Sequence, residues 1–117
     1  AAGTEFITHD GANWVFEADV DGGGIFGRII IGNNVFIGIN CILLSNTTIG
    51  DNCIIGAGSV VRGHFPENSV IAGNPGQIVS KTGVQRMLSK QNKDLLKTKG
   101  CTVAQKDLMV KAHFGIE

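Results

Sequence analysis

Residues 31–55 read Ile31-Gly-Asn-Asn-Val-Phe-Ile-Gly-Ile-Asn-Cys-Ile-Leu-Leu-Ser-Asn-Thr-Thr-Ile-Gly-Asp-Asn-Cys-Ile-Ile55, and an aliphatic residue recurs in them at every sixth position. The same spacing extends to both sides, giving the series Ile25, Ile31, Ile37, Leu43, Ile49, Ile55 and Val61. Small or β-branched residues alternate with this series at Val35, Cys41, Thr47, Cys53 and Ser59. A period of six fits neither an α-helix nor a lone strand, whereas a chain that forms a short strand, turns and repeats has this period. The pattern therefore predicts a parallel β-helix solenoid.

The composition fits one domain of 117 residues with a formal net charge of zero, and its 17 glycines suit the tight corners of a solenoid. The charges are unevenly spread: residues 1–80 hold two basic and seven acidic side chains, and residues 81–117 hold eight and three. The basic tail is either a solvated helix or an element that meets an anionic ligand or partner. Because it lacks interleaved aromatic residues and the body is acidic, nucleic-acid binding is not expected. No long apolar run predicts a membrane span, and no signal-peptide pattern begins the sequence.

Two of the three cysteines, Cys41 and Cys53, occupy the small position of their hexapeptides. They lie two hexapeptides apart, on different faces of a three-sided coil, so we interpret both as small core residues and expect no disulfide between them. Cys101 lies in the tail. This cysteine usage suits a reducing cytosol, and we expect a cytoplasmic protein.

The period also divides the chain into regions. Residues 1–12 already carry it, with Ala1 and Ile7 six positions apart, which suggests further coils upstream of this sequence. Residues 13–24 break the period and are rich in Gly and Asp, so we predict a loop that leaves the solenoid. Such a loop is either functional or a passive insertion. Residues 25–66 form the regular body.

The strict period ends at Pro66 and Glu67, because Glu67 occupies the next aliphatic position. Residues 69–75 are predicted to make a last partial coil, with a turn at Gly73-Asn-Pro75.

From Thr82 the apolar spacing becomes helical, and a second helix is predicted from about residue 103 to residue 114. We therefore divide the chain into a β-helix domain, residues 1–80, and a C-terminal helical extension, residues 81–117.

Several segments resemble the hexapeptide-repeat acyltransferases. The repeats at residues 31–40 and 49–61 are similar to theirs, and residues 68–75, Asn-Ser-Val-Ile-Ala-Gly-Asn-Pro, resemble their closing motif. Residues 8–14, Thr-His-Asp-Gly-Ala-Asn-Trp, resemble the active-site segment of a subgroup that acetylates sugars of capsular, lipopolysaccharide or exopolysaccharide precursors.

The resemblance implies an all-β solenoid, a left-handed parallel β-helix of hexapeptide repeats, with a C-terminal α-helical tail. It also implies a homotrimer in which acetyl-CoA lies in a groove between neighbouring solenoids, so that each active site is at a subunit interface. One departure concerns the closing motif, which in the family continues with Ala and Arg, whereas Gly76 and Gln77 follow here. The Arg of the family motif would make a basic contact near the adenine end of CoA, and Arg28 or Lys81 could replace it here.

Acetyl transfer from a thioester needs a base for the attacking hydroxyl and an acid for the departing thiolate. One histidine can serve both steps, and the resemblance implies that His9 is this catalytic residue. Asp10 is its neighbour in the sequence, but neighbours on a strand point to opposite faces, so Glu17 or a carboxylate of another subunit is an equal candidate to orient it. Trp14 either stacks on a sugar ring or the pantetheine arm, or anchors the loop. Asp10, Trp14 and Glu17 are the predicted substrate-binding residues.

The run Gly56-Ala-Gly-Ser59 suits CoA, because a narrow pantetheine arm must lie along backbone that bulky side chains would block. Arg62 and Lys81 either meet the CoA phosphates or are simply solvated. By analogy with the family, the predicted cofactor-binding residues are Gly38, Ala57, Gly58, Ser59, Arg62, Pro75 and Lys81. The sequence contains no P-loop or dinucleotide motif.

Three other functions stay open. N-acetylation of an aminosugar would use the same histidine. A zinc enzyme like the γ-type carbonic anhydrases needs three histidines, and the three of this chain, His9, His64 and His113, fall on different elements. We interpret His64 and His113 as surface or capping residues and expect no metal. The third possibility is a non-catalytic β-helix scaffold or fragment.

Overall fold

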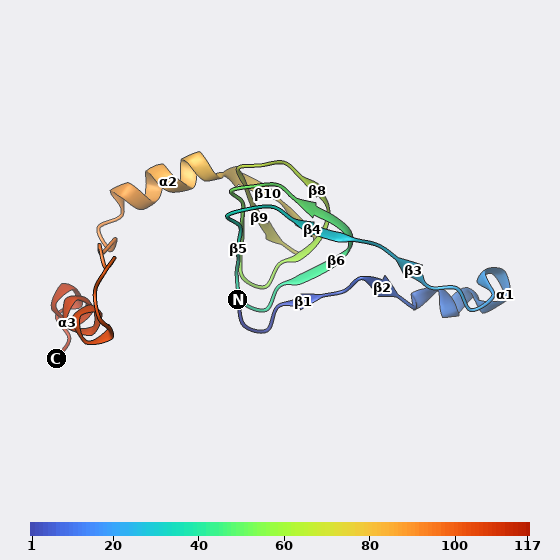
Figure 1. Cartoon of the computed structure of the whole chain (residues 1–117), viewed down its shortest axis with the longest axis horizontal. Helices are drawn as coiled ribbons and strands as arrows, with labels where there is room; N and C mark the ends of the chain where they lie inside the picture. The colour runs from blue at the N-terminus through green and yellow to red at the C-terminus, as the bar shows by residue number, and fades with distance from the viewer. The chain divides into compact units, whose positions relative to one another are not determined.

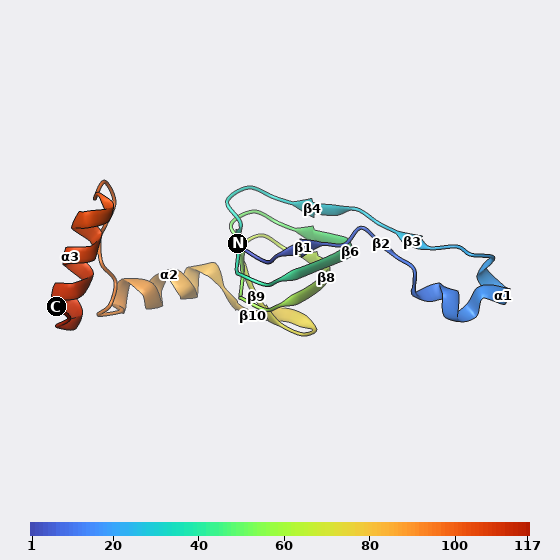
Figure 2. The same cartoon turned by 90° about the horizontal axis from the view of Figure 1, so that it is seen from below.

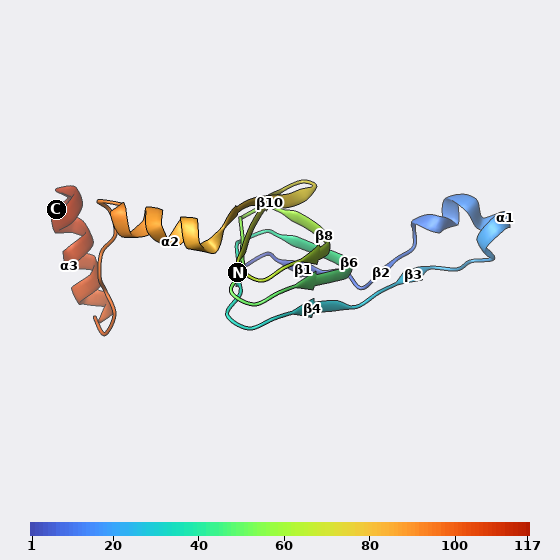
Figure 3. The same cartoon turned by 90° about the horizontal axis from the view of Figure 1, so that it is seen from above.

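The computed structural model describes all residues, 1–117, which form two compact units, Ala1–Gln85 and Arg86–Glu117. The first unit consists mainly of short strands in parallel sheets, with a small helical insertion, and the second consists of helical segments and turns. Figure 1, Figure 2 and Figure 3 show these elements from three directions. No helix combines the length and the apolar character that crossing a bilayer requires.

Two sheets carry the repeats, and the pairs within the repeats are parallel. In the first sheet, the central strand β6 (Ile42–Ile49) pairs with β1 (Glu5–Phe6), β4 (Ile29–Ile31) and β8 (Val60–Phe65). In the second sheet, the strands in order are β5 (Phe36–Ile37), β7 (Ile54–Ile55) and β9 (Ser69–Gly73).

The register follows the period of the sequence. Ile31 lies opposite Ile49, and Ile37 lies opposite Ile55, so partners are eighteen residues, or three hexapeptides, apart. The predicted parallel pairing of the repeats is thereby confirmed. In the first coil Phe6 lies opposite Leu43, one residue before Ile7, although Ile7 is the more buried of the two side chains.

Six of the seven inward positions predicted from the period form the core or pack against it. Leu43, Ile49, Ile55 and Val61 are at most 1% exposed. The small positions Cys41, Thr47, Cys53 and Ser59 are buried between them, and Ile71 of the last coil joins the cluster. Cys41 and Cys53 are buried, as predicted for small core residues, and all three cysteines are free. No buried side-chain nitrogen or oxygen lacks a hydrogen-bond partner.

Asparagines, more than glycines, turn the chain at its corners. The φ angles of Asn34, Asn40, Asn46 and Asn52, six residues apart, lie between 55° and 63°. Asn tolerates this left-handed region better than most residues because its short side chain can form local hydrogen bonds. Glycines were expected where φ is positive or where two backbone segments approach closely, and Gly38 has the second role. A Cβ atom there would lie 2.6 Å from the backbone nitrogen of Ala57.

Residues 9–26, here called the arm, leave the coils. The strands β2 (His9–Asp10) and β3 (Ile25–Phe26) pair in antiparallel fashion, and η1 (Ala12–Phe16) and α1 (Glu17–Val20) lie between them. Figure 1 shows the arm extending beyond the stacked strands. The excursion is thus longer than the predicted 13–24. Ile25, predicted as an inward residue of the regular body, is 51% exposed, because its strand pairs with β2 and not with a coil.

The last coil ends in a hairpin. The strand β10 (Gly76–Lys81) returns antiparallel to β9, with Gly76 opposite Gly73 across the predicted turn at Asn74 and Pro75. The turn is confirmed, but the sequence predicted only a partial coil and not this returning strand.

Helices occupy the predicted positions. α2 (Thr82–Gln91) spans the point at which the two units divide, and α3 (Val103–Phe114) has the predicted bounds. A capping box begins α3: the Thr102 hydroxyl accepts the Gln105 N–H at 3.1 Å, and the Gln105 side chain accepts the Thr102 N–H at 2.8 Å. In the second unit, His113 Nε2 lies 3.0 Å from Asp94 Oδ1.

Candidate active site

His9 lies at the base of the arm with an exposed side chain. Its register partner is Phe26, and the two rings stack with their centroids 5.8 Å apart and an interplanar angle of 21°. Stacking restricts the orientation of the imidazole, whereas neither ring nitrogen has a hydrogen-bond partner within the chain. The arrangement leaves both nitrogens available to a ligand.

Asp10 is directed to the backbone of the arm. Its Oδ1 accepts the Ala12 N–H at 2.6 Å, at the start of η1. The carboxylate therefore stabilises the turn by which the chain enters η1. It makes no hydrogen bond to His9, its neighbour on β2.

Trp14 and Glu17 lie farther along the arm, in η1 and α1. The Trp14 side chain is 72% exposed, and Glu17 is exposed as well. No residue of η1 or α1 is buried. Exposed aromatic surface on a segment without a core is suited to contact with a ligand or another chain, and the assignment of Trp14 and Glu17 to the substrate stays a prediction.

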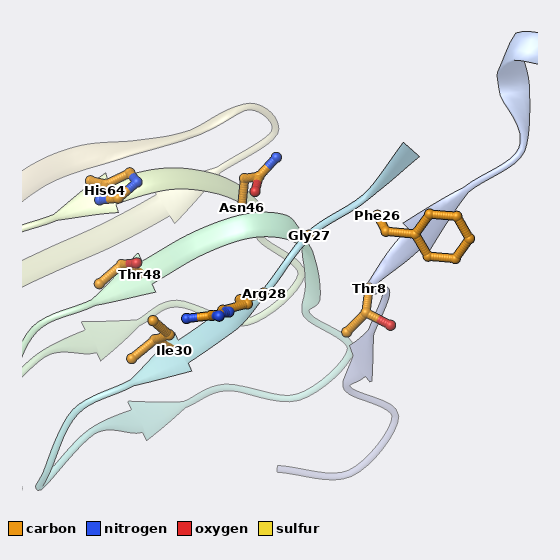
Figure 4. A pocket seen from close by; sticks show the side chains of 8 residues that line it. All are labelled: Thr8, Phe26, Gly27, Arg28, Ile30, Asn46, Thr48 and His64. Carbon is orange, nitrogen blue, oxygen red and sulfur yellow. The ribbon is translucent and has the colours of Figure 1, made fainter. Parts of the chain in front are cut away.

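A cavity of about 620 Å³ opens at the base of the arm; Phe26, the stacking partner of His9, lines it, and His9 itself does not. Thr8 and Phe26 line it on the side of the arm. On the side of the coils, it is lined by Ile30, Thr48 and His64, which lie opposite one another on β4, β6 and β8. Figure 4 shows these side chains as a row across neighbouring strands.

Arg28 and Asn46 complete the polar lining of this cavity (Figure 4). The Arg28 guanidinium makes no ion pair, since the chain's salt bridges are Lys111 with Asp107 and His113 with Asp94. No carboxylate lines the cavity. The site therefore presents one free cation, an imidazole and several neutral hydrogen-bonding groups.

His64, predicted to be a surface or capping residue, is exposed, but the sequence did not indicate that it lines this cavity. A strict period of eighteen would put Pro66 beside Thr48. The register between β6 and β8 shifts after Leu43, so that His64 takes this place. The sequence did contain a usable signal for the other two residues of this row. Ile30 and Thr48 each directly precede an inward residue of the period, so both were expected to face outward on neighbouring strands.

The predicted cofactor residues lie away from this cavity, and none of them lines it. Gly38 is buried; its N–H donates to Ile55 O at 2.9 Å and its carbonyl accepts the Thr4 hydroxyl at 3.0 Å. Ser59 is fully buried; its hydroxyl donates to Gly56 O at 2.6 Å and accepts the Gly73 N–H at 3.2 Å.

The other predicted cofactor residues have exposed side chains or backbone. Ala57 and Gly58 form a turn on the surface, and Arg62 is exposed on β8. Pro75 lies in the β9–β10 turn, and Lys81 ends β10. The roles of all seven residues stay predictions. No group of three His, Cys, Asp or Glu side chains has the arrangement of a metal site.

Comparison with known proteins adds to this description. Residues 28–63 match the family described as bacterial transferase hexapeptide (six repeats). The chain is 44% identical over 96 residues to Protein CapG of Staphylococcus aureus, covering 82% of this chain and 56% of that protein. It is 49% identical over 53 residues to the putative lipopolysaccharide biosynthesis O-acetyl transferase WbbJ of Escherichia coli strain K12, covering 45% of this chain and 27% of that protein.

Among solved structures, the chain resembles a galactoside acetyltransferase in complex with coenzyme A. The two have a TM-score of 0.62 and 30% sequence identity over 74% of this chain and 43% of the other. The likeness supports a hexapeptide-repeat β-helix fold for the first unit. The chain spans 56% of the first of these curated relatives, about half its length, and a smaller part of the second.

Proposed function

Because the chain belongs to the hexapeptide-repeat acetyltransferase family, we propose that it transfers an acetyl group from acetyl-CoA to a sugar hydroxyl. The observation that carries the proposal is the exposed His9 ring, which stacks on Phe26, a residue of the cavity lining. A relative named as an O-acetyl transferase of lipopolysaccharide biosynthesis supports an acceptor that is a precursor of a surface polysaccharide.

In the proposed reaction, His9 is the general base. A ring nitrogen takes the proton from the acceptor hydroxyl while the hydroxyl oxygen attacks the thioester carbonyl carbon. The tetrahedral intermediate then collapses, the carbon–sulfur bond breaks, and His9 returns the proton to the departing CoA thiolate. The products are an acetyl ester and CoA, and the histidine is restored. The free ring nitrogens of His9 support this role, and the Phe26 ring limits the orientations of the imidazole.

For acetyl-CoA, we propose the surface formed by Ala57 and Gly58 together with Arg62 and Lys81. Their exposure supports contact with pantetheine and phosphate groups. Gly38 and Ser59 would shape this surface from within, because their polar groups already bond inside the coils. Pro75 would act as part of the β9–β10 turn.

We further propose a left-handed coil and a homotrimer with active sites between subunits. Exposed apolar side chains on the coils support an assembly that covers them: Phe36 is 61% exposed and Ile39 is 52% exposed. Apolar surface of this kind is unfavourable in water and is commonly covered by a partner.

The proposal is tested by mixing the protein with acetyl-CoA and a panel of sugars and aminosugars, and measuring release of free thiol. His9→Gln should lower acceptor-dependent release by about 1000-fold, since general acid–base catalysis contributes roughly 100- to 10,000-fold. The matched control is His113→Gln, in the second unit, which should keep the rate. Equal rates in the His9→Gln and unmodified proteins would contradict the assignment. Coenzyme A binding without turnover of any acceptor would instead favour a scaffold.

A further inference from the structure

We propose that the cavity lined by Arg28 and His64 binds the anionic group of an acidic sugar, either a phosphate or a carboxylate. The inference rests on the proposed function, because it names the chemical class of the acceptor. Arg28 was one of two candidates from the sequence for a basic contact to CoA, but it lines a cavity that contains none of the other predicted CoA residues, and His64 has no role in the proposed proton transfer.

The free guanidinium of Arg28 favours an anionic ligand. Arg28 is exposed in the cavity and has no carboxylate partner. A guanidinium presents five N–H donors in a planar fork that matches the oxygens of a carboxylate or phosphate, and it can bind two of them at once. The hydroxyl of Thr48 and the amide of Asn46 lie in the same lining and can donate further hydrogen bonds. His64 adds a ring nitrogen at the end of the row (Figure 4).

The distribution of charge along the chain also favours an anion site in this cavity. Within residues 1–80 the chain has seven carboxylates and only two basic side chains, Arg28 and Arg62. None of the seven carboxylates lines the cavity. An acidic body repels anions at long range, so an anionic ligand needs a local site that is free of carboxylates and carries its own cation. The cavity meets both conditions, because no carboxylate lines it and Arg28 supplies the cation.

Phe26 and Thr8 connect the cavity to His9. Phe26 belongs both to the cavity lining and to the aromatic stack with His9, and Thr8 is the residue before His9. An anion held at Arg28 would leave the sugar ring to extend toward Phe26. A hydroxyl of that ring would then lie near the proposed base. The anionic group thus fixes the orientation of the sugar, and His9 acts on one of its hydroxyls.

The test is a calorimetric titration of the unmodified protein, without acetyl-CoA, with glucose, glucose 1-phosphate and glucuronic acid. At least one acidic sugar should bind about tenfold or more tightly than glucose, the amount expected for one charge-assisted bidentate contact. The two acidic probes distinguish phosphate from carboxylate. If neither binds more tightly than glucose, the proposal is wrong. It is equally wrong if inorganic phosphate binds as well as glucose 1-phosphate, since the sugar would then contribute nothing.

Variants test whether Arg28 causes the tighter binding of the acidic sugar. Arg28→Gln should remove the preference for the acidic sugar, and Arg28→Lys should keep part of it. Arg86→Gln, in the second unit, removes the same chemical group elsewhere and should leave the titration unchanged. The fold should tolerate the changes, because the Arg28 carbonyl, and not its side chain, accepts the Thr47 N–H. A preference that survives in Arg28→Gln would overturn the proposal.

Steady-state kinetics separates this proposal from the proposed function. Arg28→Gln should raise KM for an acidic acceptor and leave KM for acetyl-CoA unchanged. A rise in KM for acetyl-CoA would assign the cavity to the CoA phosphates and contradict an acceptor site. A third outcome is that neutral sugars are acetylated equally fast by Arg28→Gln and the unmodified protein, and acidic sugars are not preferred. This outcome would support the acetyltransferase function and contradict the proposal that the acceptor is acidic.

Discussion

The coils and the arm of the first unit differ in how much of their side-chain surface they bury. In the coils, successive strands bury an aliphatic column in which Leu43 and Ile55 are completely enclosed. In the arm, η1 and α1 bury no residue at all, and Trp14 and Phe26 are 72% and 75% exposed. The coils therefore supply the stability, and the arm supplies accessible chemical groups next to a rigid surface. His9 lies where the two meet, at the base of the arm.

The largest expected effect on stability comes from the aliphatic column. Leu43→Ala should lower the free energy of unfolding by about 3 kcal/mol, because it removes buried methyl groups and leaves a cavity. The matched control is Ile42→Ala on the same strand, whose side chain is 37% exposed and faces outward. Ile42→Ala should lower the free energy of unfolding by less than half as much as Leu43→Ala. Denaturant unfolding monitored by circular dichroism measures both. Equal losses would mean that the coils have no specific interior.

A smaller effect is expected at Ser59, which the sequence assigned to CoA and the structure places inside. Ser59→Ala leaves the Gly73 N–H without its side-chain partner and should cost about 1–2 kcal/mol of stability. The control Ser80→Ala, with a weak 3.5 Å contact to the next residue's carbonyl, should change stability little. If Ser59→Ala instead raised KM for acetyl-CoA at unchanged stability, the hydroxyl would be a ligand contact.

Much of the coil architecture could be predicted from sequence because it depends on local spacing. The period alone identified Leu43 and Val61 as inward residues, and the pairing of strands eighteen residues apart followed from it. The spacing also located α3, whose capping residue Thr102 precedes it.

The remaining features depend on contacts that the period does not encode. Ile25 continues the spacing, but its strand pairs with β2, so the side chain is exposed. The cavity residue His64 was missed because the β6–β8 register shifts by two residues after Leu43. The resemblance to a family drew attention to His9, whereas no motif marked Arg28 as part of the same surface.

The smallest expected effect on stability lies in the arm. Trp14→Ala should change the free energy of unfolding by no more than about 0.5 kcal/mol, because exposed side chains contribute little to the folded state. If Trp14 contacts the acceptor, KM for the acceptor should nevertheless rise. Val15→Ala, the neighbouring exposed residue in η1, is the control for both quantities. A fall of several degrees in Tm for Trp14→Ala would show that the arm is packed against another surface in solution.

The central claim is that His9 promotes transfer of an acetyl group to a sugar oxygen. It is tested most directly by mass spectrometry of sugars incubated with the protein and acetyl-CoA, before and after treatment with hydroxylamine, which cleaves esters and spares amides. We predict one acetyl group on the sugar, removed by hydroxylamine, and almost none with His9→Gln. An acetylated sugar that resists hydroxylamine would indicate an amide, and an ester formed equally by His9→Gln would contradict the role of His9.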